Sequence, residues 1–250
     1  MTSTPLTIAF VFDYKSPWLA LGLSEKEDSR DPDDHGIPNI MVLEHFGIAT
    51  APFAMISRDP QASLGARTTE RIKFAIEISR HGPDMRRYPL FAKPIGEGAS
   101  KGILVSSNIK RPDYLISTVY QLEAVYGRHD VLLETSLSGR EITVGIIGTG
   151  EDSKVIGANE YVHKDCRTFG GRQVSDWIDF ASDDVKNAPM VGKGHMDVVS
   201  ADMSDPQVRS ACQLALGTWK ALRCRDAGRI DTRFDKMGET GEPQVVQRIW

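Results

Sequence analysis

The sequence predicts a mixed fold, of either the α+β or the α/β class. Short apolar segments typical of strands are interspersed with amphipathic segments typical of helices. The chain ends in a predicted hairpin, and it contains no internal repeat. These observations indicate sheets that are covered by helices.

Composition narrows the function classes before any motif is considered. The 250 residues suffice for one large core or two modest domains, and 40% hydrophobic and 26% charged residues are ordinary for a globular protein. A net charge of −4 leaves no basic footprint, so nucleic acid is not an expected partner. No apolar run is long enough for a membrane span, and the N-terminus lacks the pattern of a secretory signal.

The cysteines point to a reducing, cytoplasmic setting. They are three in number and show no C-x-x-C pairing: Cys166, Cys212 and Cys224. An odd, unpaired set argues against a disulfide framework and against a structural zinc site.

The first part of the chain predicts one strand, a linker and a short helix. Residues 7–12 form an apolar run typical of a buried strand, and residues 24–38 are charged and rich in turn formers. Residues 39–46 predict one or two helical turns. Residues 50–56 return to strand character.

Two helices are predicted next. The first spans 66–81 and ends at Gly82, with one apolar face made of Ile72, Ala75, Ile76 and Ile78. The second spans 112–126 between Pro112 and Gly127, and its apolar stripe consists of Leu115, Val119 and Leu122.

The remaining elements are mainly strands. Strands are predicted at 130–134, 141–147 and 154–161, whereas residues 163–204 are interpreted as loop with little order. A helix over 206–222 begins after Asp205 as N-cap, with Pro206 in its first turn. Its buried stripe is Val208, Ala211, Cys212, Ala215, Trp219 and Leu222. The final hairpin pairs 228–235 with 244–249 around a turn at 236–241.

The segment most informative about chemistry is residues 88–103. An apolar strand carries Lys93, and a loop of small residues follows at 96–102. Glycines let backbone N–H groups approach a ligand, and a lysine beside them supplies a charge suited to phosphate. The spacing matches neither the P-loop nor the dinucleotide-binding motif. The alternative interpretation is a turn between two strands that carries a surface lysine.

Three further segments follow it in order, at 131–144, 224–231 and 241–249. With Lys93-Pro94 and its loop, this ordered set resembles the ATP-grasp ligases, and most closely the D-alanine–D-alanine ligase group. The resemblance covers about residues 36–250 and is most specific at 88–103, 131–147 and 222–235.

The resemblance implies an α+β ATP-grasp fold, in which two α+β modules clamp ATP. Residues 1–38 would then be a reduced N-terminal α/β module with a linker, 39–137 the small or lid module, and 138–250 the central catalytic module.

By resemblance, five residues would bind the nucleotide at its phosphate and adenine ends. Lys93 and Ser100 would contact the ATP phosphates, and Glu134 would take the adenine amino group beside the Ser136–Leu137 backbone. The alternatives are loop filler for Ser100 and a surface acid at a strand end for Glu134.

The resemblance also implies which residues would bind the ribose and the metal and which would act at the reaction centre. Glu141 would bind the ribose hydroxyls, unless it is only a partner for Arg140. Arg229 would stabilise a developing oxyanion, and Asp231 would hold magnesium, since the two lie two apart on a strand and face the same way. Their alternative interpretation is a surface ion pair.

The C-terminal motif departs from the family pattern. Gln247 falls at the position of a second magnesium ligand, where a neutral carbonyl is a weak donor. Ile249 falls at the position of a third and cannot coordinate. Low turnover with retained ATP binding is therefore expected.

The resulting function is an ATP-dependent carboxylate–amine ligase that uses ATP and Mg²⁺ on small molecules, an amino acid or other carboxylate plus an amine. The alternatives are an ATP-binding protein with impaired catalysis and a truncated, non-functional homologue. No membrane partner is expected. Apolar surface left exposed by the short N-terminal module would favour self-association, for example as a homodimer.

Overall fold

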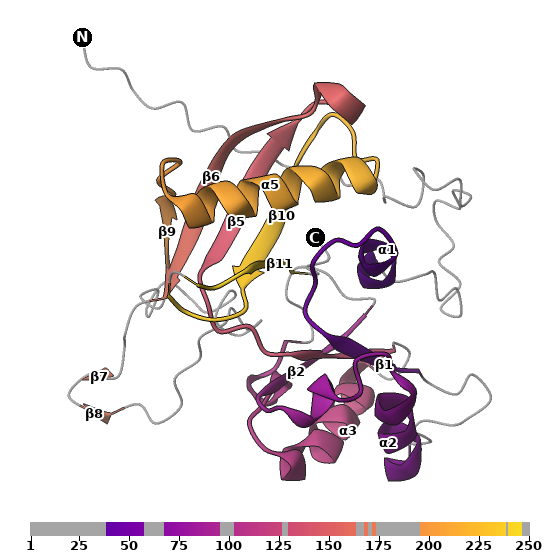
Figure 1. Ribbon diagram of the computed structural model, residues 1–250. Coiled ribbons are helices and arrows are strands. Elements are labelled where there is room, and N and C mark those ends of the chain that lie inside the picture. Colours follow the sequence, from indigo (N-terminus) through magenta and orange to yellow (C-terminus); the bar gives the residue numbers. More distant parts are fainter. Residues whose placement is uncertain are drawn as a thin grey trace.

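The structure, a computed structural model, describes residues 39–57, 68–95, 103–126, 130–163, 168–169, 172–173, 196–238 and 240–246. Its described part is built around two antiparallel sheets, each with helices on one face (Figure 1). This arrangement confirms the α+β class. The predicted strand at 7–12, the linker at 24–38, the glycine loop at 96–102 and Gly127 lie outside the described residues.

The smaller sheet has four strands in the order β1-β4-β2-β3. Its strands are β1 (Phe53–Ile56), β4 (Val131–Thr135), β2 (Leu90–Pro94) and β3 (Asn108–Ile109). The helices α2 (Thr69–Ile78) and α3 (Leu115–Tyr126) cover the face that is turned away from the larger sheet (Figure 1). Short 3₁₀ turns lie at Asp84–Arg86, Val105–Ser107 and Pro112–Tyr114.

The core beneath these helices confirms most of the predicted apolar stripes. Alternate residues of β2 and β4 point into it, together with Ile72 of α2 and Leu115, Val119 and Leu122 of α3. Ala75 and Ile76 pack against this core. The prediction for Ile78 was wrong: its exposed fraction is 66%. At about 3.6 residues per turn, it lies roughly 120° around α2 from Ile72. The helix also ends at Ile78 rather than at residue 81.

The larger sheet has five strands in the order β11-β10-β5-β6-β9. These are β11 (Pro243–Val245), β10 (Ala227–Phe234), β5 (Glu141–Ile147), β6 (Lys154–His163) and β9 (Met196–Ser200). A 3₁₀ turn at Gly150–Asp152 precedes β6. The hairpin prediction is confirmed: β10 pairs with β11, which begins at Pro243 and ends at Val245. Residues 247–249 of the predicted second strand lie outside the described residues.

The prediction of loop over 163–204 was wrong for the strands that the structure describes there, whereas residues 201–204 form the predicted loop. β9 pairs antiparallel with β6 at the edge of the sheet, with Tyr161 opposite Val198. A small pair, β7 (Thr168–Phe169) with β8 (Arg172–Gln173), lies in the same stretch. Sequence reasoning missed β9 because a five-residue edge strand with exposed valines carries no apolar/polar alternation.

Helix α5 (Pro206–Ala221) covers one face of the larger sheet (Figure 1). The Asp205 side chain accepts a hydrogen bond from the Gln207 backbone N–H, which confirms the predicted N-cap. The predicted stripe is buried against Ile142, Val144 and Ile146 of β5, with Leu222 buried just after the helix.

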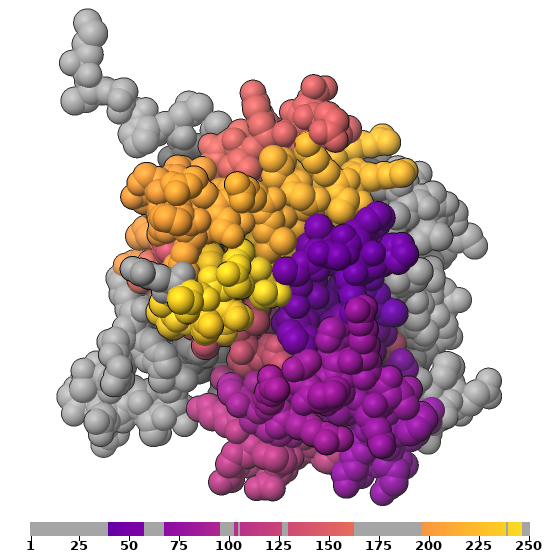
Figure 2. Space-filling model, viewed as in Figure 1, coloured from indigo at the N-terminus to yellow at the C-terminus, as the bar shows by residue number. Residues whose placement is uncertain are grey.

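Helix α1 (Asn39–His45) joins the two sheets. Val42 and Leu43 pack with Leu222 and Val245, whereas Ile40 packs against β1 and β4 of the smaller sheet. In the space-filling view, the indigo surface of residues 39–57 lies between the yellow surface near the C-terminus and the purple surface of the segment that follows it in the chain (Figure 2). Among the described residues, no helix combines the length and the apolar character needed to cross a bilayer.

One close contact in this fold can be tested with a matched pair of glycines. A Cβ at Gly228 of β10 would lie 2.6 Å from the Trp219 ring, whose indole N–H donates to the Gly148 carbonyl. We expect Gly228→Ala to lower the free energy of unfolding by about 1–3 kcal/mol through overpacking. Gly217→Ala, inside α5 with nothing within 4 Å, is expected to raise it by roughly 0.5–1 kcal/mol. Chemical denaturation measures both, and equal effects would contradict this packing.

Candidate functional site

On the smaller sheet, the face opposite α2 and α3 carries a buried ion pair. In the β2–β4 ladder, Phe91 lies opposite Glu134 and Lys93 opposite Leu132, so Lys93 and Glu134 share the face opposite the core. Lys93 Nζ donates to Glu134 Oε1 at 2.7 Å, and the side chains are only 10% and 12% exposed. Lys93 is therefore not a surface lysine, and Glu134 is not a surface acid.

On the larger sheet, the face opposite α5 carries the second group of charges. Residues Arg229, Asp231 and Arg233 alternate along β10, and Glu141 and Thr143 lie across from them on β5. Asp231 is 4% exposed and Glu141 2% exposed. The register places Thr143 opposite Asp231 and Glu141 opposite Arg233.

The predicted Arg229–Asp231 pair forms, with 3.7 Å between Arg229 Nε and Asp231 Oδ1. The aspartate side chain is 1% exposed and that of the arginine 35%. The alternative of a surface ion pair therefore does not describe Asp231. A carboxyl group so far from water, with an arginine beside it, is typical of a functional site or of a structural ion pair.

The segment 136–139 connects the two sheets and is held by backbone hydrogen bonds. The Ser136 N–H donates to the Pro89 carbonyl at 3.1 Å, and the Gly139 N–H donates to the Phe234 carbonyl at 2.9 Å. A Cβ at Gly139 would lie 2.4 Å from the Lys236 carbonyl oxygen, so only glycine fits there. Leu137 lies between these anchors and is half-buried.

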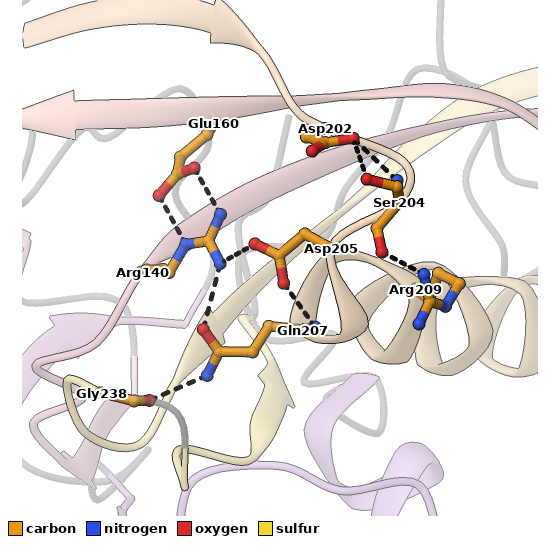
Figure 3. Close-up of polar contacts among 8 residues, drawn as sticks. All are labelled: Arg140, Glu160, Asp202, Ser204, Asp205, Gln207, Arg209 and Gly238. Carbon is orange, nitrogen blue, oxygen red and sulfur yellow. Dashed lines mark hydrogen bonds and ion pairs between the residues drawn. The ribbon is translucent and has the colours of Figure 1, made fainter.

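Arg140, next in the chain, anchors the start of β5 on the side of α5 (Figure 3). Its guanidinium donates to both oxygens of Glu160, at 2.8 and 2.7 Å, and to Asp205 Oδ2 at 2.6 Å and Gln207 Oε1 at 3.0 Å. Gln207 in turn donates to the Gly238 carbonyl at 2.9 Å. The partners of Arg140 are therefore Glu160 and Asp205, and the alternative that pairs it with Glu141 was wrong.

The oxygen atoms that the described residues offer as metal ligands suit a hard divalent cation that needs few protein ligands. No group of three or more His, Cys, Asp or Glu side chains that could hold a metal occurs within the described ranges. Asp231 offers a buried carboxylate. The Thr143 hydroxyl opposite it is buried and has no hydrogen-bond partner among the described residues. Magnesium commonly takes one or two carboxylates together with water and phosphate oxygens, so this pair fits it.

Two predicted site residues, Ser100 and Gln247, lie outside the described residues. Conversely, sequence reasoning missed Arg233 on the charged face of β10. The alternation that groups Arg229 with Asp231 extends to it two residues later, and this was the available signal.

Comparison with known proteins gives one consistent answer. The family model "D-ala D-ala ligase C-terminus" matches residues 42–241. A protein named D-alanine–D-alanine ligase from Methylorubrum populi is 32% identical over 248 residues, covering 96% of this chain and 73% of the relative. One of that name from Paramagnetospirillum magneticum is 26% identical, covering 84% of this chain but 62% of the relative.

Solved structures show the same fold. The D-alanine–D-alanine ligase from Bacillus anthracis complexed with ATP aligns with a TM-score of 0.51 at 18% identity, covering 84% of this chain and 52% of that one. VanG, a D-Ala:D-Ser ligase from Enterococcus faecalis, aligns with a TM-score of 0.53 at 16% identity, covering 83% and 49%. This chain thus spans about half the length of these proteins.

The Arg140 network makes one prediction about pH. The hydrogen bond from Arg140, and then that from the Gln207 backbone, lower the pKa of Asp205 in the folded state. The stabilisation is therefore present above the ordinary aspartate pKa of about 3.9 and is lost as the pH falls through the lowered value.

We expect Asp205→Asn, which keeps a capping oxygen, to cost about 1 kcal/mol of unfolding free energy near neutral pH, since the side chain is 27% exposed and partly screened. The difference from the unmodified chain is expected to shrink as the pH falls below about 4. Denaturant titrations along a pH series measure it, and a difference independent of pH would contradict the role of the charge.

Proposed function

Because this chain belongs to the D-alanine–D-alanine ligase family of the ATP-grasp fold, we propose that it is an ATP-dependent carboxylate–amine ligase. In such a reaction ATP phosphorylates a carboxylate, and an amine then attacks the acyl phosphate. The proposed substrates are small molecules, an amino acid or other carboxylate plus an amine.

One observation supports this proposal above the rest: in each sheet, the face opposite α2 and α3 or opposite α5 carries buried charges at the motif positions. Lys93 is 8% exposed, Glu141 2% and Asp231 4%. Burying a charge is costly unless it is paired or serves a ligand. The burial of these charged motif residues is therefore what we expect if they serve a charged ligand such as a nucleotide.

We assign the nucleotide to these faces residue by residue. Lys93, with Ser100 of the glycine loop, would contact the phosphates as a compact positive charge. Glu134 would accept the adenine amino group beside Ser136 and Leu137, and Glu141 would accept the ribose hydroxyls. The Ser136 N–H is already bonded to the Pro89 carbonyl, so Ser136 would offer its other groups to the base.

The reaction centre would lie along β10. Arg229 is more exposed than its neighbours and carries a fixed fork of donors, which suits it to hold a developing oxyanion. Asp231 would hold Mg²⁺, with Gln247 as a weaker neutral donor. Bound there with ATP, the metal would neutralise charge on the phosphates.

The presence of two separate sheets supports the proposed division into a lid module over 39–137 and a central module over 138–250. Self-association as a homodimer and a cytoplasmic location are likewise proposals that rest on the sequence. The competing possibility, ATP binding without turnover, rests on the residue types at Gln247 and Ile249.

The phosphate role of Lys93 is testable by calorimetry with ATP. We expect Lys93→Ala to weaken ATP binding by about 1.5–3 kcal/mol, the scale of a charge-assisted hydrogen bond. The variant also removes the cation 2.7 Å from buried Glu134, so its folding is checked by circular dichroism beforehand.

Lys220→Ala is the matched control, since Lys220 also contacts a carboxylate at 2.7 Å, that of Glu151, but at an exposed site. It is expected to bind ATP normally. Unchanged affinity in a folded Lys93→Ala protein would remove Lys93 from the proposed site.

The role of Asp231 is testable through magnesium and ADP release. If the chain is an active ligase, ADP is released when D-alanine or another amino acid is offered with Mg²⁺ and ATP. Asp231→Asn is expected to slow that release by about 10²–10³-fold, while binding of ATP without Mg²⁺ changes little.

Asp202→Asn serves as the control, because Asp202 is exposed and bonds within its own turn to Ser204. ATP binding without any ADP release in the unmodified chain would support the binding-only alternative. Failure to bind ATP at all would overturn both.

A further inference from the structure

Arg233 sits beside the acid that we assign to the ribose. The register of β5 and β10 places it directly opposite Glu141, on the charged face of the sheet. Its Nη1 lies 3.8 Å from Glu141 Oε2, and its Nε donates to the Gly139 carbonyl at 3.3 Å. The arginine side chain is 13% exposed and the glutamate side chain 2%.

Through these two contacts, Arg233 links segment 136–139, which joins the two sheets, to the Glu141 carboxylate. The planar guanidinium holds its donors in a fixed fork, so contact with one partner constrains the position of the other. Glu141 is only 2% exposed, and a buried carboxylate is tolerated where a cation lies close to it. Arg233 therefore constrains the orientation of Glu141.

The neighbouring arginines contact other partners. Arg140 lies on the side of α5, where it is bonded to Glu160, Asp205 and Gln207. Arg229 lies four residues earlier on β10 and contacts Asp231.

We propose that Arg233 is a positioning residue that orients Glu141 toward the ribose and so sets the preference of the site for a nucleotide with both ribose hydroxyls. This inference rests on the proposed nucleotide site. It adds a residue that acts through Glu141 without touching the reacting atoms.

The test compares ATP with 2′,3′-dideoxy-ATP, which lacks both ribose hydroxyls. The measured quantity is the ratio of their dissociation constants, obtained by calorimetry for each variant. We expect the unmodified chain to prefer ATP and Arg233→Met to reduce that preference by about tenfold, the scale of a misplaced charge-assisted hydrogen bond. A merely structural role would weaken both nucleotides equally and leave the ratio unchanged.

A double-variant cycle shows whether Arg233 acts through Glu141. In a Glu141→Gln background, Arg233→Met is expected to change the ratio no further. Arg87→Met is the matched control, since Arg87 lies 3.7 Å from Asp84 at an exposed site, and it is expected to leave the ratio unchanged.

Each outcome decides the proposal. The positioning role is overturned if Arg233→Met leaves the preference for ATP unchanged. It is also overturned if Arg233→Met lowers that preference as much in the Glu141→Gln background as in the unmodified chain. The proposed nucleotide site stands in either case. An unmodified chain that binds neither nucleotide overturns the proposed function itself. If Arg233→Met does not fold, Arg233→Lys replaces it, since lysine keeps the charge but not the fork of donors. We expect Arg233→Lys to reduce the preference for ATP by about threefold. An unchanged preference in that variant overturns the positioning role.

Discussion

The antiparallel register between β5 and β10 is the constraint on which the rest of this structure depends. It places Thr143 opposite Asp231 and Glu141 opposite Arg233 on one face. On the other face it places Ile142, Val144 and Ile146 against α5. A slip of one residue in either strand would turn its charges into the core and its apolar side chains outward. Burying that apolar row therefore also holds the charged row in place.

The connection between the two sheets depends on the ends of these strands. Segment 136–139 leaves β4 and joins β5 through backbone bonds to Pro89 and Phe234, and Gly139 is required because backbone atoms lie where a Cβ would stand. Arg140 then holds the start of β5 to β6 and to the first turn of α5. The charged faces of both sheets are thereby attached to the same short segment.

The buried charges are arranged as pairs of opposite sign, which explains how the fold tolerates them. Lys93 with Glu134 lies on one sheet, and Arg229 with Asp231 and Arg233 with Glu141 lie on the other. Breaking a buried pair by removing one partner leaves an uncompensated charge and is more costly than losing a surface pair. At the proposed site, a nucleotide with its metal would bring both signs of charge, so each buried side chain could exchange its partner for a charge of the ligand.

The sequence alone determined the local elements and the types of chemistry. Apolar segments located β4 and β5, alternation located β10, the Asp205-Pro206 signal located the start of α5, and the ordered motifs carried the ATP-grasp resemblance. Local signals suffice there because each depends on residues within a few positions of one another. Only the tertiary structure decided which side chains meet. It paired β9 with β6, directed Arg140 to Glu160 and Asp205, and placed Arg233 beside Glu141. Those outcomes depend on strand register and helix docking between residues far apart in the chain, and no local pattern encodes them.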